Sequence, residues 1–157
     1  MRLGIAISVI VLLLDQLSKL ALLNIADLES GGYRLAPFLD IVLVWNRGIS
    51  YGLFQQDSAI GRWGLAAITI VAVVALSIWL RRARGPLVGT ALGLVIGGAI
   101  GNGIDRIAYG AVVDFVHFHV GSFSWYVFNV ADVAIVAGAA GLLLDALIGS
   151  RRADKPR

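Results

Sequence analysis

Cysteine is absent from the sequence, which excludes disulfide bonds, thiolate nucleophiles and cysteine-ligated metal sites. Charge is also scarce, because Asp, Glu, Lys and Arg make up only 15% of the 157 residues, whereas about 25% is usual in a soluble domain. Apolar residues reach 59% and the mean hydropathy is +0.86. This balance indicates an integral membrane protein, and at this length we expect a single domain over residues 1–157.

Four apolar stretches are long enough to cross a hydrocarbon core about 30 Å thick. We expect membrane-spanning helices at about residues 3–25, 62–80, 86–107 and 126–148. The first stretch resembles a signal peptide, but Asp15 and Lys19 interrupt it and no clean cleavage site follows. Because Asp15 and Lys19 are four residues apart, they share one helix face and can form a structural ion pair.

Two segments outside the apolar stretches have the character of strands. Residues 38–46, FLDIVLVWN, are rich in β-branched and aromatic side chains. Residues 112–120, VVDFVHFHV, alternate in the manner of a strand. We therefore predict the membrane all-α class, with four transmembrane helices and a small extracytoplasmic β-cradle at about 27–58.

The basic residues gather at the ends of the apolar stretches, so the pI near 9.7 reflects membrane topology and not nucleic-acid binding. One side of the predicted membrane holds Arg2, Arg81, Arg82, Arg84, Arg151, Arg152, Lys155 and Arg157. The other side holds Arg34, Arg47 and Arg62. The positive-inside rule then places both termini in the cytoplasm and segments 27–58 and 108–125 outside.

The third stretch carries a glycine every four residues, at Gly89, Gly93, Gly97 and Gly101. Such a stripe lets another helix approach its backbone closely. Asp105 continues the stripe one turn later, and Asn102 and Arg106 lie on the row beside it. These polar side chains are therefore expected to face packed helices and not lipid.

Three aspartates near the predicted outer boundary compete for a catalytic role. Asp105 precedes Arg106, and a carboxylate beside a guanidinium tends to stay ionised, which suits a structural role. Asp114 and Asp132 lie among apolar neighbours, so a pair of them in one cleft would share a proton and could activate water as aspartic peptidases do. The alternative is a small intramembrane transporter or proton-coupled protein, because intramembrane carboxylates serve such pathways at least as often.

The two histidines give a weaker signal. His117 and His119 would project from one face of a strand, but two ligands without a third are poor evidence of a zinc site. We therefore expect no metal and no cofactor.

Five blocks, in this order, resemble the signature blocks of the lipoprotein signal peptidases, or signal peptidase II family. They are DQLSK (15–19), NRGISYGLF (46–54), GGAIGNGIDR (97–106), VVDFVHF (112–118) and FNVADVAI (128–135). The resemblance implies an aspartic endopeptidase of the bacterial inner membrane, with its active site near the outer leaflet. Such an enzyme removes the signal peptide of prolipoproteins by cutting before a diacylglyceryl-modified cysteine.

The same resemblance implies roles for individual residues. The catalytic aspartates fall on Asp114 and Asp132. Substrate-binding positions fall on Asn46, Gly48, Asn102, Arg106 and Asn129, and supporting positions fall on Asp15, Lys19 and Asp105. The implied partners are lipid-modified prolipoproteins and membrane lipids, without nucleic acid, and we expect a monomer. One local departure is Tyr51, where the family pattern commonly has Phe; the ring is kept.

Overall fold

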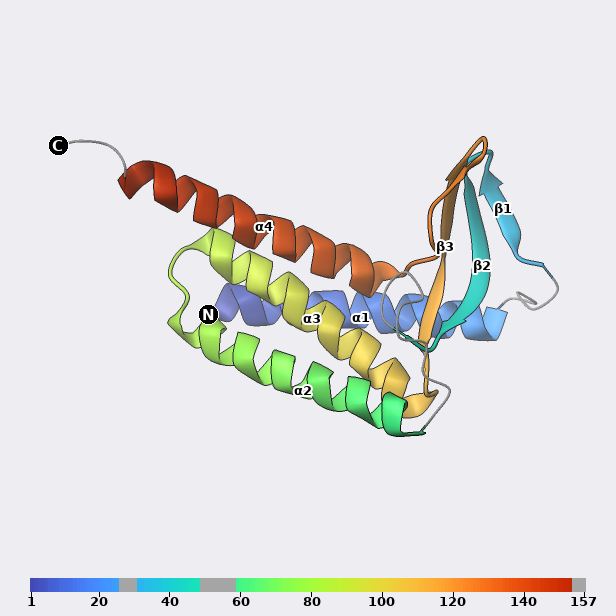
Figure 1. The fold of residues 1–157 in the computed structure, drawn as a ribbon, viewed down its shortest axis with the longest axis horizontal. Helices are drawn as coiled ribbons and strands as arrows, with labels where there is room; N and C mark the ends of the chain where they lie inside the picture. Colours follow the sequence, from blue (N-terminus) through green and yellow to red (C-terminus); the bar gives the residue numbers. More distant parts are fainter. Residues whose placement is uncertain (26–30, 49–58, 154–157) are drawn as a thin grey trace.

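Four long helices dominate the computed structural model, which describes residues 1–25, 31–48 and 59–153 (Figure 1). They are α1 (Arg2–Ile25), α2 (Ala59–Arg82), α3 (Pro86–Ala108) and α4 (Val130–Ala153). Each is long and apolar enough to cross a membrane. The predicted fold class of four membrane helices with a small sheet is therefore confirmed.

Helix α3 lies at the centre of the bundle, and α1, α2 and α4 pack against it. The glycine stripe explains how α1 comes so close, since a Cβ at Gly97 would lie 2.6 Å from the carbonyl oxygen of Ser8. On the neighbouring row, a Cβ at Gly98 would lie 2.5 Å from the carbonyl oxygen of Ala131 in α4. The close approach predicted from the glycine spacing is present, and it involves two helices.

Helix α4 begins at Val130, four residues later than its predicted start at Tyr126. The backbone of Phe128 pairs with that of Val116, so this part of the chain is extended. Asn129 then caps the helix: its Oδ1 accepts from the Asp132 N–H at 2.9 Å, and Asp132 Oδ2 accepts from the Asn129 N–H at 3.2 Å. This reciprocal capping box sets the helix start, which hydropathy alone does not detect.

The sheet stands at one end of the bundle, opposite the N-terminus and the α2–α3 connection (Figure 1). Its strands are β1 (Tyr33–Ala36), β2 (Leu39–Asn46), β3 (Val112–Val120) and β4 (Phe123–Ser124), in the order β1-β2-β3-β4. All neighbours are antiparallel. The two predicted strands, β2 and β3, are thus adjacent. Two of the four strands, β3 and β4, come from a segment outside the predicted cradle of 27–58. Residues 26–30 and 49–58 of that region, Tyr51 included, lie outside the described residues.

Candidate active site

Asp114 lies in the buried part of β3, where only 2% of it is exposed. Its Oδ2 accepts from Asn46 Nδ2 of the neighbouring strand at 2.9 Å. Its Oδ1 accepts from Asn129 Nδ2, at the start of α4, at 2.6 Å. The sheet and the last helix therefore both hold this carboxylate.

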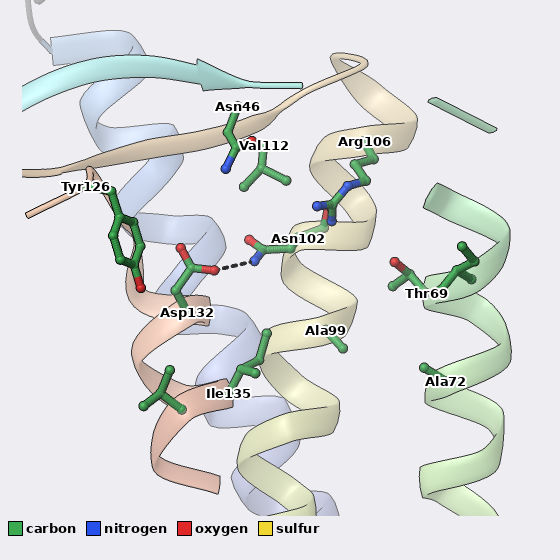
Figure 2. Close-up of a pocket in the computed structure, with 12 residues that line it drawn as sticks. Asn46, Thr69, Ala72, Ala99, Asn102, Arg106, Val112, Tyr126, Asp132 and Ile135 are labelled. Atoms are coloured by element: carbon green, nitrogen blue, oxygen red, sulfur yellow. Dashed lines mark hydrogen bonds between the residues drawn. The ribbon is translucent and has the colours of Figure 1, made fainter. Parts of the chain in front are cut away.

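Asp132 lies in the first turn of α4, and its side chain is partly exposed. Its Oδ1 accepts from Asn102 Nδ2 of α3 at 2.9 Å, the contact drawn as a dashed line in Figure 2. Asn129 Nδ2 also lies 3.2 Å from Asn102 Oδ1. One asparagine therefore joins Asp114 to the Asn102–Asp132 pair in a single hydrogen-bond network.

Burial dominates the electrostatics of Asp114. Desolvation, with a smaller contribution from the negative charge of Asp132, raises the pKa of Asp114 to about 6. The amide donors of Asn46 and Asn129 and the charge of Lys19 oppose this shift. A carboxyl group with such a pKa can hold or release a proton near neutral pH, as an acid–base catalyst requires.

A buried cluster of ion pairs contacts the hydrogen-bond network through Asn102. Lys19 Nζ lies 2.8 Å from Asp15 Oδ2, so the predicted ion pair is present. The same ammonium group donates to Asn102 Oδ1 at 3.0 Å. Asp15 Oδ1 accepts from the Ala131 N–H at the start of α4 at 3.0 Å. The cluster thus links α1, α3 and α4 and fixes which way the Asn102 amide points.

Asp105 belongs to this cluster, and its partner differs from the one predicted. Its Oδ2 lies 2.7 Å from Lys19 Nζ and accepts from the Val113 N–H at 3.1 Å. The adjacent Arg106 was predicted as the partner because it is next in sequence, but successive helix residues point in different directions. Asp105 therefore positions β3 relative to α1 and α3. Within the described residues it makes no direct hydrogen bond to Asp114 or Asp132 and is linked to Asn102 through Lys19.

Arg106 instead reaches towards the end of β2. Its Nη2 donates to the carbonyl oxygen of Gly48 at 3.2 Å, and the Gly48 N–H donates to Asn46 Oδ1 at 3.0 Å. Asn46 is thereby oriented with its Nδ2 towards Asp114. The three residues thus act as one positioning unit for that carboxylate.

A cavity of about 240 Å³ opens beside the network (Figure 2). Its polar wall contains Asn46, Asn102, Arg106, Tyr126 and Asp132, and its remaining lining is Ile68, Thr69, Ala72, Ala99, Val112, Ile135 and Val136. Asp132 lines the cavity, whereas the deeper Asp114 does not. The site therefore offers a carboxylate, amides and a guanidinium to a ligand that also contacts apolar side chains of α2 and α4.

Comparison with known proteins identifies the family. The family model for signal peptidase (SPase) II matches residues 7–148. The chain belongs to the signal peptidase II family. A lipoprotein signal peptidase of Methylobacterium radiotolerans is 57% identical over 155 residues, covering 98% of this chain and 91% of the relative. Another, of Beijerinckia indica, is 61% identical over 136 residues, covering 86% of this chain and 81% of the relative.

Solved structures agree with this membership. A bacterial membrane enzyme determined by the in meso method at 2.3 Å resolution has a TM-score of 0.85 at 26% identity, covering 98% of this chain and 92% of that one. A second, at 1.9 Å resolution, has a TM-score of 0.79 at 26% identity, with 92% of both chains covered. The chain is thus a membrane peptidase of the signal peptidase II family, and the transporter alternative finds no support in these comparisons.

Sequence reasoning missed several contributors to this signal peptidase II site. No site residue was predicted in helix α2, yet Ile68, Thr69 and Ala72 line the cavity. Gln16 Nε2 donates to Asp105 Oδ1 at 3.0 Å and to the carbonyl oxygen of Gly101 at 3.2 Å. Gln16 follows Asp15 directly within the block DQLSK, which is the signal that could have identified it.

The expectation that no third ligand accompanies the two histidines is wrong. Asp40 Oδ2 lies 2.9 Å from His119 Nε2 and 3.9 Å from His117 Nδ1. Asp40 is only 20% exposed. The pairing of β2 with β3 brings it opposite His117, which the separate sequence segments did not reveal.

Proposed function

We propose that this chain is an aspartic endopeptidase that removes the signal peptide of prolipoproteins, with Asp114 and Asp132 as its catalytic carboxylates. One observation carries the proposal: two carboxylates from different elements share a hydrogen-bond network beside a cavity that one of them lines. Family membership and the relatives' name, lipoprotein signal peptidase, support the choice of substrate. The cut falls before a diacylglyceryl-modified cysteine.

The chemistry uses one proton shared by the pair. The ionised carboxylate takes a proton from water as the water oxygen attacks the scissile carbonyl carbon, and the protonated partner gives its proton to the carbonyl oxygen. The tetrahedral diol then collapses: one of its hydroxyl groups returns a proton to the second carboxylate, the C–N bond breaks, and the amine leaves with the proton held by the first carboxyl group. The raised pKa of Asp114 supports such sharing.

The amides and the guanidinium bind and orient the peptide. Asn46, Asn102 and Arg106 line the cavity and can hydrogen-bond the backbone of the substrate peptide. Asn129 meanwhile fixes the position of the two carboxylates relative to each other. Gly48 keeps Asn46 and Arg106 in place through its backbone. Asp15, Lys19 and Asp105 support the site without touching the substrate.

The lipid of the substrate would remain largely in the membrane. The cavity volume of about 240 Å³ is below the roughly 300–1,000 Å³ of a typical ligand pocket, so it suits a short peptide segment and not acyl chains. The apolar lining from α2 and α4 supports lateral entry between these helices, with the acyl chains against their outer faces. We place the monomeric enzyme in the bacterial inner membrane, as one domain with both termini cytoplasmic and the site near the outer leaflet.

Cleavage of defined precursors tests this function. Purified protein in detergent, without any ion gradient, should cleave a diacylglyceryl-modified precursor peptide at the bond before the cysteine, and mass spectrometry of the products locates the cut. The same peptide without lipid is the matched control and should be cleaved far more slowly. Equal cleavage of both peptides would refute the lipid requirement, and no cleavage of either would refute the peptidase assignment.

A further inference from the structure

Asp40, His117 and His119 form a separate cluster of ionisable side chains, on the sheet. The register places Asp40 of β2 opposite His117 of β3. Because side chains alternate along a strand, His119 lies on the same face as His117. Their side chains are 20–25% exposed, so the cluster is partly sheltered but open to solvent.

The spacing of the ligand atoms suits a metal ion. One atom from each residue lies within 4.8 Å of the other two. Ligand atoms around a tetrahedral zinc ion, bound at about 2.0–2.1 Å, lie about 3.3 Å apart. The distances of 2.9 and 3.9 Å from Asp40 Oδ2 to the two imidazoles bracket this value, so small side-chain rotations would equalise them.

His119 Nε2 is hydrogen-bonded to Asp40 Oδ2 at 2.9 Å, a contact that a bound ion would replace. The other hydrogen bonds around the cluster leave the required atoms available. Ser124 Oγ donates to the carbonyl oxygen of Trp125 at 3.4 Å, so it can accept from His117 Nε2, 2.8 Å away. His117 Nδ1, which faces Asp40, is then the unprotonated nitrogen, and metal-bound histidines are commonly held in this way through their other nitrogen. Arg34 Nε donates to Asp40 Oδ1 at 3.4 Å and leaves Oδ2 for an ion.

We propose that Asp40, His117 and His119 bind a divalent transition-metal ion of the zinc class. Two imidazoles and one carboxylate suit zinc and its neighbours better than calcium or magnesium, which prefer oxygen ligands, and a water molecule completes the tetrahedron. Copper(II) should bind more tightly than zinc.

The ion would clamp β2 to β3 and take no part in peptide cleavage. These two strands also carry Asn46 and Asp114, so their pairing positions the proposed catalytic carboxylate. Asp114 lies three residues before His117 on β3 and is not one of the proposed ligands. Metal binding should therefore stabilise the sheet while leaving the reacting groups unchanged.

Zinc titration of the purified full-length protein tests the site. His117 and His119 are the only two histidines in the chain and cysteine is absent, so an untagged protein has no other imidazole or thiolate ligand. Calorimetry in detergent should give one zinc ion per chain, and zinc should raise Tm relative to protein in EDTA. His119→Gln and Asp40→Asn should abolish saturable binding. Ser124→Ala should weaken it by about 10–100-fold.

Controls separate a lost site from a lost fold. Each variant should match wild-type Tm in EDTA to within a few degrees, and Asp145→Asn, an exposed carboxylate on α4, should bind zinc as the wild type does. Absence of saturable binding to the wild type, or binding unchanged in both His119→Gln and Asp40→Asn, would overturn the site. Cleavage by the EDTA-treated protein well below its Tm should match that of the zinc-loaded protein. A loss of cleavage after EDTA treatment would overturn the proposal that the ion only stabilises the pairing of β2 with β3. It would not bear on the roles of Asp114 and Asp132.

Discussion

At the scale of single residues, the three buried or partly buried aspartates near the sheet differ in what their oxygens accept. Asp105 accepts from an ammonium group, a backbone N–H and the Gln16 amide, and the ammonium group above all stabilises a permanent charge. Asp114 accepts from two neutral amides, and Asp132 accepts from one amide and one backbone N–H. Only the last two therefore combine a weakly compensated charge with contact to the same network, as proton exchange requires.

Replacing each of these aspartates by asparagine should separate chemistry from structure, because the shape is kept while the base is lost. Asp114→Asn and Asp132→Asn should insert, bind a lipopeptide inhibitor and show no cleavage in a single-turnover assay. Asp105→Asn should keep some turnover and lose about 1–3 kcal/mol of stability, because Lys19 retains Asp15 as a partner. A folded, inhibitor-binding but inactive Asp105→Asn beside a partly active Asp114→Asn would mean that the wrong pair was chosen.

The raised pKa of Asp114 predicts how stability changes with pH. Below about pH 4 the group is protonated in both states, and between there and about pH 6 the folded state binds more protons. Stability should therefore fall as pH rises through this window, by about 2–3 kcal/mol for the full shift. Unfolding measured from pH 4 to 7 should show a shallower fall for Asp114→Asn than for wild type.

The slope with pH is the quantity to compare, since asparagine at position 114 also presents an N–H group to one of the amide donors, a cost independent of pH. Gly64→Ala, which changes no titratable group, should give a curve parallel to that of the wild type. Parallel curves for Asp114→Asn and wild type would contradict the assignment of this window to Asp114.

At the scale of elements, α3 brings the others together through its small residues. Helix α1 packs against the row that contains Gly97, and α4 packs against Gly98. The first turn of α4 carries Asp132. The ion cluster of Asp15, Lys19 and Asp105 forms where α1 meets the end of this stripe. Close helix packing and the polar network are therefore parts of one arrangement.

Gly97→Ala should test this packing. The added methyl group would lie 2.6 Å from the Ser8 carbonyl oxygen, so α1 must shift, and overpacking of this kind costs about 1–3 kcal/mol. Tm should fall, and cleavage should fall with it because Lys19 moves with α1. Gly64→Ala is the matched control: its Cβ meets nothing within 4 Å, and alanine is the better helix former, so Tm should stay or rise. Equal Tm values for the two variants would contradict the packing role of Gly97.

At the scale of the whole molecule, the two ends of the helix bundle differ in charge and in structure. The N-terminus and the α2–α3 connection lie at one end of the bundle, and the sheet lies at the other (Figure 1). Arg81 and Arg82, in the last turn of α2, are at the first end. The positive-inside rule predicts that this end is cytoplasmic, and we therefore propose that the sheet and the candidate site face outward.

Single-cysteine labelling can check this orientation directly, because the chain has no cysteine of its own. Leu35→Cys lies on β1 at a position that is 63% exposed, and Arg84→Cys lies in the α2–α3 connection. A membrane-impermeant maleimide should label Leu35→Cys in intact spheroplasts and Arg84→Cys only after permeabilisation. The reverse pattern would invert the topology.

The sequence by itself determined the four membrane helices, the two strand segments and the Asp15–Lys19 pair. It also predicted Asp114 and Asp132 as the catalytic carboxylates, which stays a prediction. These follow from hydropathy, helical spacing and residue type, which are local along the chain. Only the tertiary structure decided that α4 starts at Val130, that Lys19 is the partner of Asp105, and that Asp40 joins the histidines. Each of these depends on a contact between segments distant in sequence, set by how the helices and strands pack.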